Sequence, residues 1–155
     1  MTGTATDRLA RLGLVLPAPM APVATYVPFV RSGQLVFVSG QGPVRDGTIF
    51  STGRLGAELT LEDGYAAARL TALNLLAQLR AACHGNLDRV ARVVRLLGFV
   101  ASTPGFTEHD AVMDGASDLL IAVFGEAGRH ARAVLGAPSL PFQTSVEIEG
   151  IFEVA

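Results

Sequence analysis

Arg132 and Glu147 are two side chains of this sequence that could act together on a small carboxylic acid. Arg132 interrupts an apolar run over residues 131–135, where a guanidinium is costly unless it meets an anion. Its planar fork matches a carboxylate, so Arg132 is a candidate substrate-binding residue; the alternatives are an ion pair within the chain or a side chain that reaches solvent. Glu147 falls on the polar face of the last predicted strand, where it could position and deprotonate a water or could be merely solvated.

Other catalytic and metal-binding motifs are mostly absent. All 12 basic residues are arginines, which excludes a lysine Schiff base and the lysine of a P-loop. His84, His109 and His130 lack the spacing of metal ligands, and we expect them to be surface or helix-end residues. Cys83 and His84 are adjacent, so on a helix they point about 100° apart and cannot easily share a metal. The sequence therefore predicts neither a metal site nor a cofactor.

The composition of the 155 residues predicts one domain, residues 1–155, that associates with copies of itself. Hydrophobic residues make up 50% of the chain and charged residues 17%, against about 25% charged residues in typical soluble domains. Such a domain cannot bury all this apolar surface alone, so part should lie between subunits. A net charge of −2 argues against binding to nucleic acid. The single cysteine fits a cytoplasmic location, and we find no signal peptide and no membrane span.

Periodicity and turn signals predict an α+β fold with a mixed β-sheet and two helices packed on one face. Thr60 with Asp63 forms a variant of the capping box at the start of the first long helix. In the last strand, alternate residues are apolar, so one face should meet the helices and the other should be polar. The expected helices cover residues 61–83 and 109–124, and the expected strands cover 26–31, 34–39, 89–101, 131–135 and 145–154, with a hairpin turn at Asp46-Gly47. Residues 1–25 form a leader with a short helix over 6–12 and a proline-rich segment.

Three stretches of the sequence carry a resemblance to a known family: 26–41, 86–90 (NLDRV) and 131–149. The last is the most specific, because Arg132 precedes Leu140 by eight residues and Pro141 precedes Glu147 by six. On these residues the sequence resembles the Rid/YjgF family of reactive intermediate deaminases, often labelled endoribonuclease L-PSP. The leader and residues 112–120 resemble a longer, chorismate-mutase-like subgroup of that family.

The resemblance implies a chorismate-mutase-like fold and a homotrimer with active sites in the clefts between subunits. It implies hydrolysis of small 2-imino acids, or of their 2-aminoacrylate-type enamine tautomers, to 2-keto acids and ammonia, without a cofactor. By the same resemblance, Arg132 holds the substrate carboxylate and Glu147 orients or activates the water.

The resemblance also implies four further substrate-binding positions. Tyr26 and Ser39 match positions that line the pocket, and the main chain near Val134 matches a segment that contacts the substrate. Asp114 stands where many members carry an asparagine. An ionised carboxylate accepts hydrogen bonds but cannot donate them, and it would repel a carboxylate substrate.

Two other functions remain open from the sequence. One is a non-catalytic trimer that binds a small carboxylate metabolite, and the other is a pathway-specific hydrolase of an enamine or imine. A ribonuclease is disfavoured, because the sequence has no basic stripe and no paired histidines. We expect the leader to pack on the outside of the trimer or to cover the cleft.

Overall fold

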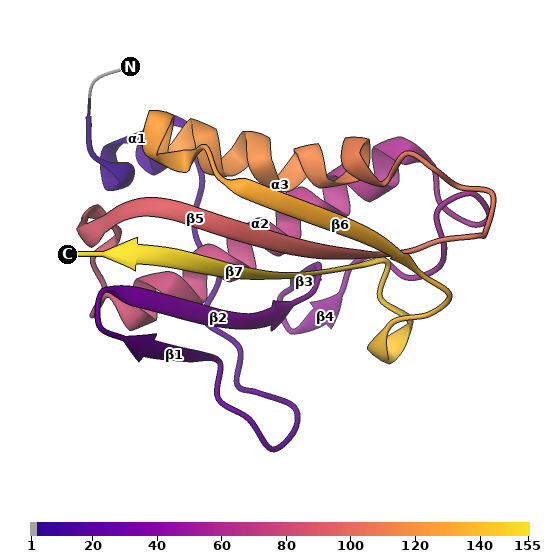
Figure 1. Ribbon diagram of the computed structural model, residues 1–155, viewed down its shortest axis with the longest axis horizontal. Coiled ribbons are helices and arrows are strands. Elements are labelled where there is room, and N and C mark those ends of the chain that lie inside the picture. The colour runs from indigo at the N-terminus through magenta and orange to yellow at the C-terminus, as the bar shows by residue number, and fades with distance from the viewer. Residues whose placement is uncertain (1–2) are drawn as a thin grey trace.

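The computed structural model describes residues 3–155. Its main sheet has five strands in the order β1-β2-β7-β5-β6, as the ribbon in Figure 1 shows. Neighbouring strands are antiparallel except β5 and β6, which are parallel, so the predicted mixed sheet is confirmed. In chain order the elements are α1 (Ala5–Arg11), β1 (Phe29–Ser32), β2 (Leu35–Gln41), β3 (Val44–Arg45), β4 (Thr48–Ile49), α2 (Leu61–Ala82), η1 (Leu87–Arg89), β5 (Val90–Ala101), α3 (His109–Phe124), η2 (Gly125–Gly128), β6 (Ala131–Ala137), η3 (Pro141–Gln143) and β7 (Val146–Val154).

The two long helices cover one face of the sheet, as predicted. Helix α2 packs across β2 and β7, and α3 packs beside it against β5 and β6 (Figure 1). The alternation of β7 explains this layer: Ile148 and Phe152 are fully buried under the helices, whereas Glu147 and Glu149 point to the other face. We call this second face the open face of the sheet.

Local signals define most element boundaries. Thr60 and Asp63 form the predicted capping box, in which the Asp63 amide donates to Thr60 Oγ1 at 3.2 Å and the Thr60 amide donates to Asp63 Oδ2 at 2.9 Å. Asp46 and Gly47, with φ of 50° and 75°, make the predicted turn between β3 and β4. The strand expected from residue 26 begins instead at Phe29, because Pro28 has no N–H to donate to a neighbouring strand.

The open face retains exposed apolar side chains. Val30, Leu35 and Phe37 are 53%, 37% and 41% exposed on β1 and β2, and Leu135 is 53% exposed on the edge strand β6. Large apolar side chains on a sheet face favour association with another surface. Within residues 3–155, no helix is long and apolar enough to cross a membrane.

The leader is attached to the domain at both ends. At its start, the amide and hydroxyl of Thr6 donate to Asp88 Oδ1 at 2.9 and 3.0 Å. Further along, Leu16 is buried, and the buried side chain of Gln78 on α2 donates from Nε2 to the carbonyl of Met20 at 2.7 Å. This hydrogen bond ties the proline-rich segment to α2.

Helices α2 and α3 approach each other closely at Gly115, so we expect Gly115→Ala to destabilise the fold. A Cβ there would collide with the carbonyl oxygen of Tyr65 and lie 3.2 Å from the Arg69 amide nitrogen. Overpacking of this kind costs about 1–3 kcal/mol, more than the higher helix propensity of alanine returns. Urea unfolding measures the loss. Gly105→Ala is the control, since a Cβ there meets nothing within 4 Å, and equal midpoints for the two variants would contradict this account.

Candidate functional site

A cavity of about 800 Å³ lies beside the end of β2 and the start of β7. Three of the predicted site residues, Tyr26, Ser39 and Glu147, line it. A smaller cavity of about 200 Å³ near α1 contains none of them. The complete lining of the large cavity is Met20, Ala21, Pro22, Val23, Ala24, Tyr26, Pro28, Ser39, Gly40, Gln41, Gly42, Val44, Gly47, Ile49, Pro141, Phe142, Thr144, Glu147 and Glu149.

Glu147 provides a half-buried carboxyl group to this cavity. It lies opposite Phe99 of β5 and above Gly40, where any Cβ would collide with Glu147 Oε1. Burial raises the pKa of the Glu147 carboxyl, and the negative charge of Glu149 raises it further. No hydrogen bond from residues 3–155 offsets these two effects. The ionised group is therefore a better proton acceptor than an ordinary surface glutamate, and the raised pKa lets it hold the proton that it takes until it passes it on.

Ser39 and Tyr26 form one wall of the cavity. The hydroxyl of Ser39 donates to the carbonyl of Val27 at 2.7 Å, and the Ser39 amide donates to the carbonyl of Pro28 at 2.9 Å. These bonds hold the segment before β1 against β2 and so place Tyr26, which is 46% exposed, at the cavity.

Two residues that sequence reasoning missed, Asn74 and Gln78, support the cavity from α2. Asn74 Nδ2 donates to the carbonyls of Gly42 and Val44 at 3.2 and 2.9 Å, and Gln78 holds Met20. Both are buried and lie four residues apart, so they project from the same side of the helix. Two amides at core positions of a leucine-rich helix are the signal that could have identified them.

Phe142 is exposed beside the same cavity on an unusual backbone. It and Gln143 have φ of 58° and 59°, the left-handed region that few residues other than glycine adopt. The Phe142 side chain is 66% exposed. The turn between β6 and β7 therefore presents an aromatic ring at the edge of the cavity.

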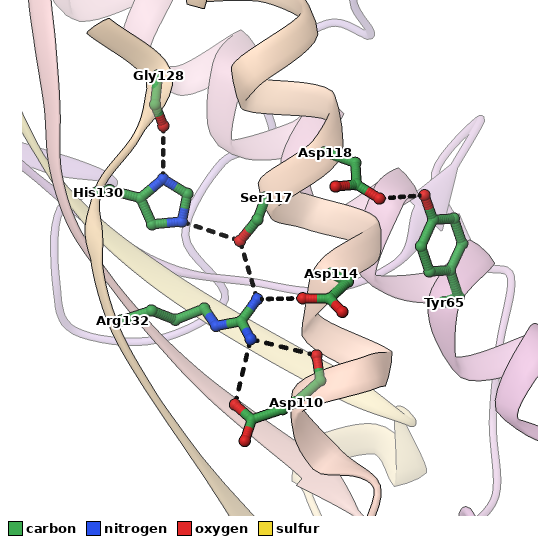
Figure 2. A network of polar contacts seen from close by, with 8 residues as sticks. All are labelled: Tyr65, Asp110, Asp114, Ser117, Asp118, Gly128, His130 and Arg132. Atoms are coloured by element: carbon green, nitrogen blue, oxygen red, sulfur yellow. Dashed lines mark hydrogen bonds and ion pairs between the residues drawn. The ribbon is translucent and has the colours of Figure 1, made fainter. Parts of the chain in front are cut away.

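Arg132 lies elsewhere, on the helix-covered side of the edge strand β6 (Figure 2). Nη1 donates to Asp114 Oδ1 at 2.9 Å and to Ser117 Oγ at 3.0 Å. Nη2 donates to Asp110 Oδ1 at 3.1 Å and to the Asp110 carbonyl at 3.3 Å. The side chain is only 19% exposed. The structure thus contains the ion pair within the chain that the sequence left open as an alternative, and Asp114 is one of its two carboxylates.

His130 extends this network on the other side of Ser117. Its Nδ1 donates to the carbonyl of Gly128 at 2.6 Å, because a carbonyl can only accept. In the neutral ring Nε2 then accepts from the Ser117 hydroxyl at 2.9 Å, and burial lowers the pKa of His130 in favour of this neutral ring. The expectation of a surface or helix-end histidine is wrong for His130, which is half-buried and hydrogen-bonded.

The predicted site residues therefore form two groups in one chain. Glu147 points to the open face at the level of Phe99, whereas Arg132 points to α3 at the level of Leu96. Val134 follows Arg132 on the same side of β6 and packs against the core. Strand β5 separates the two groups, and neither Arg132, Asp114 nor Val134 lines the large cavity. Among residues 3–155, no group of three or more His, Cys, Asp or Glu side chains could hold a metal ion.

With this geometry established, comparison with known proteins identifies the family. Residues 6–153 match the family described as YjgF/chorismate mutase-like endoribonuclease. The chain belongs to this family. It is 49% identical over 154 residues to Protein TCP17 of Trypanosoma cruzi, covering 99% of this chain and 96% of that protein. The family resemblance in the sequence and the α+β fold that it implied are confirmed.

Two solved structures locate the chain within the YjgF family. An endoribonuclease-labelled protein from Shewanella oneidensis is 39% identical and superposes with a TM-score of 0.95 over 98% of this chain and 100% of that one. RidA from a Psychrobacter species is 28% identical, with a TM-score of 0.60 over 88% of this chain and 94% of that one. The fold is shared with RidA, but the detailed backbone is much closer to the Shewanella protein.

The raised pKa of Glu147 has a measurable consequence for stability. The folded protein holds the Glu147 proton more tightly than the unfolded chain does, so ionisation of this group at neutral pH destabilises the fold. We expect Glu147→Gln to raise the melting temperature at neutral pH. This gain should shrink as the pH falls from the raised pKa of the folded protein towards the ordinary glutamate value of 4.5, and it should be lost below that value, where both states are protonated.

Glu62→Gln provides a control with the same change in net charge. Glu62 is exposed in the first turn of α2, where a negative charge is favourable, so its replacement should not raise the melting temperature. A thermal scan of both variants across the acidic range would contradict the account of Glu147 if its gain were equal at every pH.

Proposed function

We propose that this protein hydrolyses small 2-imino acids, or their enamine tautomers, to 2-keto acids and ammonia. Water adds to the carbon of the C=N bond, a proton reaches the nitrogen, and ammonia leaves from the resulting tetrahedral carbon. The observation that carries the proposal is the half-buried Glu147 carboxyl with a raised pKa at a largely apolar cavity. Such a group can take a proton from the attacking water and deliver one to the departing nitrogen.

Arg132 binds the substrate carboxylate in this proposal. Since Arg132 and Glu147 lie on opposite faces of the sheet in one chain, each complete site combines Arg132 of one subunit with the Glu147 cavity of its neighbour. The cavity lies towards the β1-β2 edge and Arg132 on the β6 edge, so the interface joins two different surfaces. Interfaces of that kind can close into a ring, and the ring that we propose is a homotrimer. The exposed apolar side chains of the open face would be buried in it.

A second candidate is a non-catalytic trimer that binds a small carboxylate metabolite. Its specific support is that, within one chain, Arg132 lies on the opposite face of the sheet from Glu147, so a carboxylate held by Arg132 would not meet Glu147 there. The backbone differs from that of RidA, with a TM-score of 0.60, and this difference also supports a hydrolase that acts on a different, pathway-specific enamine or imine. Phosphodiester cleavage is disfavoured, because the ionisable side chains at the cavity include Glu147 and Glu149, which repel a polyanion.

Variants of Arg132 and Glu147 test the chemistry. An amino-acid oxidase generates the imine, semicarbazide traps it, and loss of trapped product reports hydrolysis. Arg132→Ala should lower kcat/KM roughly ten- to hundredfold, since a charged hydrogen bond contributes about 1.5–3 kcal/mol. Arg132→Lys should restore only part of this, because the fork is lost. Glu147→Gln should bind ligand but turn over slowly. Wild-type protein that hydrolyses no imino acid would favour the binding protein instead.

A mixing experiment tests the shared cleft. Trimers that contain both Arg132→Ala and Glu147→Gln subunits include clefts with a natural Arg132 from one subunit and a natural Glu147 from the next. Random assembly of equal amounts leaves about one quarter of all clefts natural, so co-expression should restore about a quarter of wild-type activity. Each variant alone, and the two mixed after separate assembly, provide the controls. No recovery on co-expression would mean that both residues act within one chain.

A further inference from the structure

Within residues 3–155, both terminal nitrogens of Arg132 have hydrogen-bond acceptors, whereas Nε has none. Nη1 donates to Asp114 and Ser117, and Nη2 donates twice to Asp110 (Figure 2). Among residues 3–155, none accepts a hydrogen bond from Nε. A carboxylate that binds a guanidinium through two parallel N–H groups can use the Nη1/Nη2 end or the Nε/Nη2 side. A carboxylate that approaches the Nε/Nη2 side would therefore meet one donor, Nε, that has no acceptor among residues 3–155.

The partners on the two terminal nitrogens differ in how firmly they are held. At Nη1, Ser117 is only 9% exposed and is tied through His130 to the carbonyl of Gly128. Asp114, the second partner of Nη1, is 53% exposed. At Nη2, the Asp110 side chain is 84% exposed and has no other side-chain partner among residues 3–155. The Nη1 end is therefore anchored in the fold, whereas at Nη2 the contact with the Asp110 carboxylate, unlike the one with the Asp110 carbonyl, can exchange with solvent.

We propose that the Asp110 carboxylate is a placeholder: it holds Nη2 of Arg132 in the free protein and is displaced by the ligand carboxylate, which then binds Nε and Nη2. Asp114, Ser117 and His130 are positioning residues that keep the guanidinium in place during the exchange. This inference rests on the proposed function, in which Arg132 binds the substrate carboxylate.

The exchange requires little from the protein. Asp110 is the exposed partner of this pair, and after it leaves Nη2 it stays near the N-terminus of α3, where a negative charge is favourable. Its charge still opposes an incoming anion. A neutral residue at position 110 should therefore bind carboxylates more tightly, and Asp110 reduces the affinity of the site in the natural protein.

Direct binding of pyruvate and 2-oxobutanoate, the simplest keto-acid products, tests this proposal by calorimetry on the assembled protein. Asp110→Asn should lower the dissociation constant about two- to fivefold, because the Asp110 carboxylate that competes for Nη2 is itself exposed to solvent, which weakens its attraction. Asp110→Ser should have the same effect, which would show that the tighter binding comes from removal of the charge and not from the asparagine side chain. Asp118→Asn is the matched control: it removes the same charge from the same helix, but Asp118 accepts from Tyr65 and not from Arg132. It should leave affinity unchanged.

The outcomes separate this proposal from the function on which it rests. If neither acid binds, or if Arg132→Ala binds them as well as wild type, the proposed role of Arg132 is wrong. If Arg132→Ala abolishes binding but both Asp110 variants bind equally or more weakly, only the placeholder is wrong. Equal tightening by Asp118→Asn would also overturn the placeholder, because it would show an effect of net charge alone.

Discussion

The positive charge of Arg132 must be neutralised where β6 packs against α3, and much of the surrounding sequence serves this requirement. At 19% exposure the guanidinium has lost most of its water, and a charge in that position is strongly destabilising without partners. Helix α3 supplies them from successive turns, since Asp110 and Asp114 are four residues apart and project on the same side. Ser117 adds an oxygen from the next turn. The network therefore fixes the register of α3 on the edge strand as well as the direction in which Arg132 points.

The two-residue period of β-strands imposes a second constraint, which links assembly to chemistry. Glu147 must face away from the helices because its neighbours Val146 and Ile148 are fully buried beneath them. Arg132 must face the helices because its acceptors are there. No movement of loops can bring the two together through the intervening strand β5. In the proposed function, a reaction that uses both residues accordingly needs a second chain, for which the exposed apolar side chains of the open face would be the binding surface.

The sequence predicted the layers and the long elements because their causes are local: the period of α2, the capping box at Thr60 and the alternation of β7 are all visible in the chain. It identified Arg132 as a charge that needs an anion, but not Asp110 as its partner, because periodicity shows which side of a strand a residue takes and not which helical turn lies above it. The sequence did not predict the hydrogen bond between Ser117 and His130 for the same reason. The raised pKa of Glu147 depends on its burial, which the sequence does not show, and the leader and the turn at Phe142 line the cavity only through tertiary contacts.

In the proposed function, the charge balance at Arg132 also restricts which anion can bind there. One guanidinium with two carboxylates leaves a net negative charge, so bulk electrostatic attraction cannot draw a ligand to it. Once Asp110 turns to solvent, the remaining Arg132–Asp114 pair is neutral, and recognition depends on the direction of the two free N–H groups. A planar carboxylate satisfies both at once, whereas a spherical anion satisfies them poorly. Such a site selects by geometry rather than by charge, which suits a substrate whose reacting carbon is uncharged and needs only to be held near water.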